Sequence, residues 1–248
     1  MTEPVDLPER PAEFAASAPE TGDGADGEPV YAVGIGPGSP DFLTRRGART
    51  VREADVVVGF ETVVEFVREE IDGDALPCGY RDEPEALARF AERVADGERG
   101  TAVLMGDPNH SGYQFLGKLE AAVDAPVEVV PGVSSLQVAA SRARTPMEAT
   151  TFVTLHKSGP IEVDLRRLEQ DVGERHLLVL PRPYDWMPER VAHRLLESGA
   201  PDCDALVLER LTHDDESVTR TSLSALAADV EGRAETAFSD LSVLAVRR

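Results

Sequence analysis

Three loops rich in glycine and proline carry the residue types that could bind or transform a ligand. The first, Gly34–Asp41 with the sequence GIGPGSPD, begins at the end of the apolar run Val30–Ile35. Its glycine spacing resembles the loop that binds a dinucleotide pyrophosphate, and Glu61 stands about where an acid would bind the ribose. Ser39 replaces the last glycine of that pattern, however, and Pro37 removes an N–H that a pyrophosphate would use. The loop therefore leaves open a nicotinamide or flavin site, another ligand, or only a tight turn between strand and helix.

The second loop, Gly106–Tyr113, follows an apolar run that ends at Met105. Its Asp107 is unsuited to a phosphate but suits a cation or a hydroxyl group, and Pro108 fixes the turn. Alternatively, Asp107 only forms an Asx turn that opens the following helix. No second histidine or carboxylate accompanies His110 at the spacing of a metal site, so no metal is expected.

The third loop, Pro131–Gln137, follows the apolar run Val127–Val130. Ser134 or Ser135 suits the N-cap of a helix, and the next N–H groups could bond a carboxylate or an adenine edge. Capping alone would also explain the serines. Because all three loops follow strands, we expect them at the edge where open α/β sheets bind ligands.

Alternating strands and amphipathic helices must position these loops. The expected strands of the first half are Val30–Ile35, Asp55–Val58, Thr101–Met105 and Val127–Val130. The expected helices are Leu43–Glu53, Thr62–Glu70, Pro84–Ala95, Gly112–Ala122 and Ser134–Arg142. This order predicts a mostly parallel sheet with helices on both faces.

The second half predicts another α/β domain with a mixed sheet. Its expected strands are Thr151–Leu155, His176–Leu180, Ala205–Leu208, Ser217–Thr221 and Leu241–Val246, and its expected helices are Val163–Gln170 and Pro188–Ser198. The turn at Arg144-Thr145-Pro146 is the expected boundary, which gives domains over 29–144 and 145–248. Residues 1–28 lack a sustained apolar period and predict a disordered acidic tail.

Composition bounds the function and its setting. The 248 residues carry a net charge of −21, and lysine occurs only at positions 118 and 157. A surface rich in acid and poor in lysine is typical of halophilic proteins, although an acidic protein with a basic partner is an alternative. No basic stripe for nucleic acid is found. No apolar run is long enough for a membrane span, and the acidic N-terminus is unlike a usual signal peptide, so a cytoplasmic location is expected. Cys78 and Cys203 lack the pairing of a disulfide framework.

Together the loops resemble one family, the tetrapyrrole methylases, over residues 30–246. Its motifs are a GxGPG loop followed by Leu-Thr, an Ala-Asp-Val strand entry, a GDP turn and a PGxSS turn. They stand here at Gly34–Thr44, Ala54–Val56, Gly106–Pro108 and Pro131–Ser135. The resemblance implies two α/β domains with the cofactor cleft between them, and S-adenosylmethionine as methyl donor. Ser134–Ala139 and Thr154–His156 most resemble the branch that methylates a cobalt-precorrin at C5 of the corrin ring.

The resemblance also implies site residues and partners. The implied cofactor contacts are Pro37, Gly106, Asp107, His110, Ser134, Ser135, Leu155, Pro181 and Leu211. The candidates for proton transfer are Asp107, Tyr113 and His156, each with an ordinary loop role as the alternative. A homodimer is implied. Whether a separate enzyme carries out methylation and decarboxylation at C15 stays open.

Arg45 and Arg46, just after the first loop, are candidates for clamping the carboxylates of a corrin; the alternative is that they are exposed helix residues. Other readings also remain. Within the fold, the enzyme could instead methylate a precorrin at another position, uroporphyrinogen-III, or diphthamide on a protein. From other classes, a nicotinamide-dependent oxidoreductase and a non-catalytic ligand sensor are the alternatives.

Overall fold

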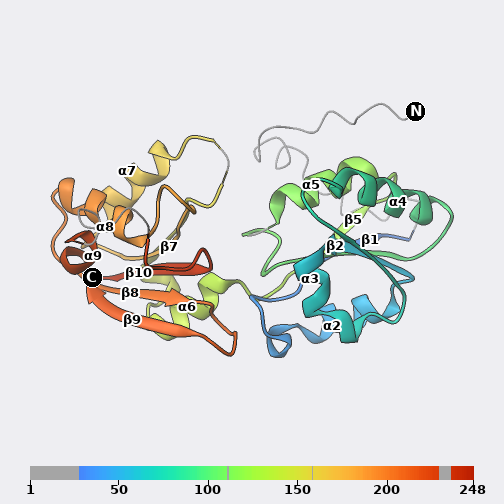
Figure 1. Ribbon diagram of the computed structural model, residues 1–248, viewed down its shortest axis with the longest axis horizontal. Helices are drawn as coiled ribbons and strands as arrows, with labels where there is room; N and C mark the ends of the chain where they lie inside the picture. Colours follow the sequence, from blue (N-terminus) through green and yellow to red (C-terminus); the bar gives the residue numbers. More distant parts are fainter. Residues whose placement is uncertain (1–27, 111, 158, 229–235) are drawn as a thin grey trace. The chain divides into compact units, whose positions relative to one another are not determined.

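The computed structural model describes residues 28–110, 112–157, 159–228 and 236–248. The chain divides into two compact units, one ending at Ser134 and the other beginning at Ser135. Each unit has a β-sheet with helices, which confirms the predicted α/β class (Figure 1). Nearly all of the predicted tail, residues 1–27, lies outside the described residues.

Unit 1 contains a parallel sheet with the strand order β3-β2-β4-β1-β5. The strands are β1 (Val30–Gly34), β2 (Val56–Phe60), β3 (Asp74–Cys78), β4 (Gly100–Leu104) and β5 (Val127–Val130). The helices are α2 (Arg45–Glu53), α3 (Glu61–Phe66), α4 (Glu83–Ala95) and α5 (Tyr113–Ala122), with short 3₁₀ turns η1 (Pro40–Phe42) and η2 (Arg68–Glu70).

The central strands β1, β2 and β4 are buried on both faces and are nearly continuous apolar runs, as is typical of parallel sheets covered by helices. Alternate side chains such as Val56 and Val58 pack with α4 and α5, whereas Val57 and Val103 pack with α2 and α3. Figure 1 shows α4 and α5 on one side of the sheet and α2 and α3 on the other. The predicted parallel sheet covered on both faces is therefore confirmed.

The strand order brings the three sequence loops to one edge. β1 lies between β4 and β5, so the loops after these three strands are neighbours. β1 leads to α2 on one face and β4 leads to α5 on the opposite face, which makes this point a topological switch. Ligands of open α/β sheets bind at such points, outside the carboxyl ends of the strands.

Two details of unit 1 differ from the expectation. The predicted helix Thr62–Glu70 is divided, because α3 ends at Phe66 and the next residue, Val67, has the non-helical angles φ −115° and ψ 16° before η2 begins. Val63, Val64 and Val67 are buried, and their branched side chains favour core packing over a long regular helix. The strand β3 was not expected, because Pro77 lies within it and proline is unusual inside a strand. The structure places β3 at the edge of the sheet, where a proline is tolerated.

Unit 2 contains the predicted mixed sheet, with the strand order β6-β7-β10-β8-β9. The strands are β6 (Thr150–Thr154), β7 (His176–Leu180), β8 (Asp204–Glu209), β9 (Ser217–Ser222) and β10 (Ser242–Arg247). The helices are α6 (Ser135–Ala143), α7 (Glu162–Asp171), α8 (Pro188–Glu197) and α9 (Leu223–Ala228), with the short turn η3 (Met147–Ala149). β6 and β7 are parallel, and β10 runs antiparallel to both β7 and β8. β6, β7 and β8 therefore point the same way.

The units divide ten residues before the expected turn at Thr145. The reason is α6, which packs against β7 and β10 of unit 2. In the part of the chain that the structure describes, no helix is both long enough and apolar enough to span a membrane.

Candidate functional site

The three loops of unit 1 meet through the backbones of Gly34, Gly106 and Gly132. A methyl group added to Gly132 would lie 2.1 Å from the carbonyl oxygen of Gly106 and 2.7 Å from that of Gly34. A methyl group added to Gly34 would lie 2.6 Å from the same Gly106 oxygen and 2.7 Å from the Gly132 nitrogen. Only glycine fits these positions, because any side chain would force the loops apart.

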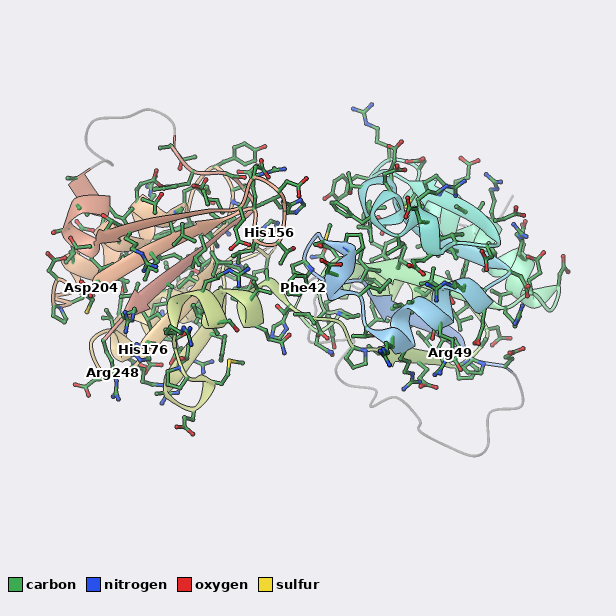
Figure 2. The ribbon with its side chains drawn as sticks, turned by 90° about the horizontal axis from the view of Figure 1, so that it is seen from below. Phe42, Arg49, His156, His176, Asp204 and Arg248 are labelled. Carbon is green, nitrogen blue, oxygen red and sulfur yellow. The ribbon has the colours of Figure 1, made fainter. Side chains whose placement is uncertain are left out.

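Reciprocal backbone hydrogen bonds join the first and second loops. The Gly106 N–H donates to the Gly36 oxygen at 2.8 Å, and the Gly36 N–H donates to the Gly106 oxygen at 3.2 Å. Both residues have positive φ, 90° at Gly36 and 68° at Gly106, which glycine adopts without strain. Phe42 closes this turn from η1, since its Cβ lies 3.1 Å from the position of a methyl group on Gly36 (Figure 2).

Asp107 ties the second loop to the third. Its carboxylate is buried, and Oδ1 accepts from the backbone N–H of Asn109 at 2.9 Å and from Nδ2 of Asn109 at 3.0 Å. The first of these bonds is the expected Asx turn. Oδ2 accepts from the Gly132 N–H at 3.1 Å, a cross-loop bond that the sequence did not predict. His110 Nδ1 lies 3.8 Å from Oδ1, too far for a hydrogen bond.

The remaining predicted residues of unit 1 have varied surroundings. Pro37 is half-buried in the first loop, and His110 is exposed. Ser134 is 2 % exposed, at the last position of unit 1, and Ser135 begins α6 of unit 2. Tyr113 is the first residue of α5 and packs against the core under α4 and α5.

The predicted residues of unit 2 lie at one edge of its sheet. Leu155 follows β6, Pro181 follows β7 and Leu211 follows β8, and all three are buried. Because β6, β7 and β8 point the same way, these positions share the edge formed by the carboxyl ends of those strands. His156, labelled in Figure 2, also follows β6 and is exposed.

The candidate substrate arginines stand in the first turn of α2. Arg45 and Arg46 are exposed, and Arg46 forms an ion pair with Glu128 of β5. That pair occupies part of the Arg46 guanidinium. Glu61 is exposed at the start of α3. Thr44 caps α2, with its Oγ1 accepting from the Gly47 N–H at 3.0 Å, a role that sequence reasoning missed although threonine before a helix is a usual cap.

The chemistry of this edge fits a methyl donor with a positive sulfonium better than a pyrophosphate. Asp107 places a buried negative charge there, which would repel phosphate groups and attract a cation. Backbone groups of tightly packed glycine loops can also approach a ligand closely. Among the described residues, no group of histidine, cysteine and acidic side chains could hold a metal ion.

Comparison with known proteins agrees with this chemistry. The sequence pattern of the family Tetrapyrrole (Corrin/Porphyrin) Methylases matches residues 29–227. A probable cobalt-precorrin-7 C(5)-methyltransferase of Methanocaldococcus jannaschii is 30 % identical over 201 residues, which cover 80 % of this chain and 91 % of that protein. A cobalt-precorrin-4 C(11)-methyltransferase of Priestia megaterium is 24 % identical over 208 residues, covering 79 % of this chain and 80 % of that one.

A solved structure also shares the fold. The uroporphyrin-III C-methyl transferase of Thermus thermophilus, complexed with S-adenosyl homocysteine, matches with a TM-score of 0.66 at 24 % identity. The match covers 88 % of this chain and 92 % of that one.

Proposed function

The chain belongs to the tetrapyrrole (corrin/porphyrin) methylases, and on that premise we propose that it methylates a cobalt-precorrin at C5 of the corrin ring during cobalamin biosynthesis. It is a methyltransferase that uses S-adenosylmethionine. The observation that carries the proposal is the edge where Gly34, Gly106 and Gly132 pack together and Asp107 binds the third loop. The choice of C5 is supported by the Methanocaldococcus relative, and the precorrin-4 relative makes another ring carbon the alternative.

We propose that the cofactor contacts are those implied by the sequence. In unit 1 the proposed contacts are Pro37 and Gly106, in the loops after β1 and β4, and Asp107, which accepts from the Gly132 N–H of the third loop. The other proposed contacts are His110, Ser134, Ser135, Leu155, Pro181 and Leu211. When bound, S-adenosylmethionine supplies an activated methyl group, so the protein mainly needs to align donor and ring carbon.

Few side chains are candidates for removing a proton from the methylated ring. Asp107 already accepts three N–H bonds, which suits it to hold loops rather than exchange protons. We therefore propose His156 and Tyr113 as the residues to test for proton transfer from the methylated ring. A role in proton transfer predicts that H156N or Y113F changes the pH profile of kcat, whereas a loop role predicts an unchanged profile.

A corrin precursor carries several carboxylates, which a chain with a net charge of −21 would repel. Its binding site therefore needs cationic side chains. We propose Arg45 as the stronger candidate, because Arg46 is paired with Glu128. R45A is expected to weaken corrin binding and to leave S-adenosylmethionine binding unchanged. Equal corrin affinity in R45A and wild type would remove Arg45 from the site.

We also propose that the enzyme works as a homodimer in the cytoplasm of a salt-accumulating cell. Both lysines of the chain lie in ion pairs, Lys118 with Glu83 at 2.5 Å and Lys157 with Asp164 at 2.6 Å. The two lysines are thus both paired with carboxylates, and acidic residues outnumber basic ones in the chain. Light scattering in low and molar KCl tests the dimer, and a urea midpoint that does not rise with KCl would contradict the halophilic assignment.

One assay tests the proposed reaction. The protein is incubated in molar KCl with methyl-labelled S-adenosylmethionine and a panel of corrin intermediates, and the added methyl group is located by NMR. Label at C5 is the expected result, and label at another carbon would assign a different precorrin step. Calorimetric titrations with S-adenosylmethionine and NADH provide the control, since binding of NADH alone would overturn the methyltransferase assignment.

A further inference from the structure

A tight turn follows β7 in unit 2 and spans Arg182–Trp186. The Arg182 N–H donates to the Trp186 oxygen at 3.2 Å, and the Trp186 N–H donates back at 3.0 Å, so the two residues form an antiparallel bridge. Between them, Pro183 fixes one backbone angle. The turn projects from the edge of the sheet where β6, β7 and β8 end.

The base of this turn is held from several sides. The Arg182 guanidinium makes two bonds to the Asp185 carboxylate, at 2.8 and 2.6 Å, and a third to the Gly159 oxygen at 3.2 Å. The hydrogen bond from Arg182 also lowers the pKa of Asp185, which keeps that carboxylate charged. Trp186 packs against the core of unit 2, and the guanidinium carbon of Arg190 lies 5.8 Å from its ring. The turn is therefore a rigid support.

Tyr184, in the middle of this turn, has an unusual backbone conformation and is highly exposed. Its φ is 74°, in the left-handed region that favours glycine, and the residue is 96 % exposed. A turn at this position would form more easily with glycine or asparagine. The tyrosine thus accepts backbone strain and gains no packing within the described residues, and such strain persists where it serves function.

Strain is concentrated at the same sheet edge. Among the described residues, positive φ outside glycine occurs at Arg144, Tyr184, Arg210 and Thr212. Arg210 and Thr212 belong to the loop after β8, so they share with Tyr184 the edge formed by strands that point the same way. Carboxyl ends of parallel strands are where α/β sheets bind ligands.

We propose that Tyr184 is a preformed aromatic platform that stacks on the conjugated face of the tetrapyrrole substrate. The inference rests on the proposed function, because the proposed substrate, a cobalt-precorrin, supplies a partly conjugated ring face with carboxylates at its rim. Tyrosine is suited to this role because it offers a large contact area with few torsions to fix. Arg190, in the first turn of α8 and beside the Trp186 ring, provides a cation for a rim carboxylate.

The chain offers a direct reporter for the test. Trp186 is its only tryptophan and lies in the turn itself. Cobyrinic acid, a stable cobalt corrin with free carboxylates, absorbs where tryptophan emits and should quench Trp186 when it binds nearby. Titration in molar KCl gives its Kd for the wild type, Y184F, Y184A and Y184G. The matched control is Y80A, because Tyr80 is also an exposed tyrosine, 87 % accessible, and has no positive φ.

Loss of the ring should raise the Kd about three- to tenfold in Y184A, whereas Y184F should stay within about twofold of the wild type. Y184G should bind as weakly as Y184A although glycine relieves the backbone strain, which separates the ring from the turn geometry. Y80A should bind like the wild type, and S-adenosylmethionine should bind every variant equally.

Three other results would overturn the proposed role of Tyr184. If the wild type binds cobyrinic acid and Y184A binds it equally well, Tyr184 is no platform for the substrate, while the proposed function stands. A lower oligomeric state in Y184A with unchanged corrin affinity would assign Tyr184 to a protein contact and would overturn the inference. If the wild type binds S-adenosylmethionine but neither cobyrinic acid nor any other tetrapyrrole offered, the proposed substrate class and the inference both fall.

Discussion

Replacing Asp107 with asparagine should loosen the edge where the three glycine loops meet. The amide keeps one oxygen, so it can satisfy either the Asn109 donors or the Gly132 N–H, but not both. In its better orientation the side-chain NH₂ faces the Gly132 N–H, donor against donor. A lost bond to a charged acceptor that leaves a donor unpaired costs about 1–3 kcal/mol. Gly132 is only half-buried, so water can partly replace the carboxylate and about 1–2 kcal/mol is expected.

The same free energy bears on cofactor binding. If the third loop must stay attached for S-adenosylmethionine to bind, a cost of about 1–2 kcal/mol raises the Kd by roughly 5- to 30-fold. The assay is urea unfolding followed by circular dichroism in molar KCl, together with calorimetric titration of S-adenosylmethionine. D41N is the matched control, because Asp41 is an exposed acid of the first loop and the charge change is identical. If D107N matches D41N in both measurements, Asp107 does not hold the loops as described.

Three further perturbations test other parts of the structure. G132A should cost at least about 3 kcal/mol in urea unfolding, because its methyl group meets backbone at 2.1 Å, whereas G79A, whose methyl group lies 3.2 Å from a carboxylate oxygen, should be nearly neutral. The Arg99 side-chain hydrogen bond is the main cause that lowers the pKa of Asp55 from 3.8 to about 2. The ionised Asp55 carboxylate therefore contributes its full stabilisation above pH 3.8, and this stabilisation is lost as the pH falls towards 2. NMR titration should find the Asp55 pKa raised in R99A but still below 3.8, because the Arg99 backbone N–H keeps its bond to the carboxylate, and an unchanged pKa would contradict the pairing. Burial raises the pKa of the Cys78 thiol to about 11, so the folded protein should react with iodoacetamide at this residue far more slowly at pH 8 than the urea-unfolded chain; equal rates would contradict this.

The loops and the fold class could be predicted from local patterns, because glycine, proline and aspartate at turns have local physical causes. The Asx turn of Asp107 is such a case, since its partner Asn109 stands two residues away. The bond from Gly132 to Asp107 spans 25 residues and depends on β5 lying beside β1. Strand order is a property of the whole sheet, so no local pattern could reveal that contact.

Other features escaped prediction for similar reasons. Glu128, the partner of Arg46, comes from a strand remote in sequence. The strand β3 contains Pro77, which argues against a strand unless its place at the sheet edge is known. The left-handed backbone of Tyr184 is invisible in sequence, because tyrosine rarely adopts it and only the bonds at the base of the turn enforce it.

The mutual packing of Gly34, Gly106 and Gly132 limits how this site can change during evolution or engineering. Each glycine is required only while the other two loops hold their present positions, since the atoms that exclude a side chain are their backbone atoms. Once one substitution has displaced a loop, a second should cost less than it does alone, so the costs should not add. Variants of this edge are therefore best sought as simultaneous replacements of whole loops, because stepwise changes pass through a first mutant that carries most of the cost.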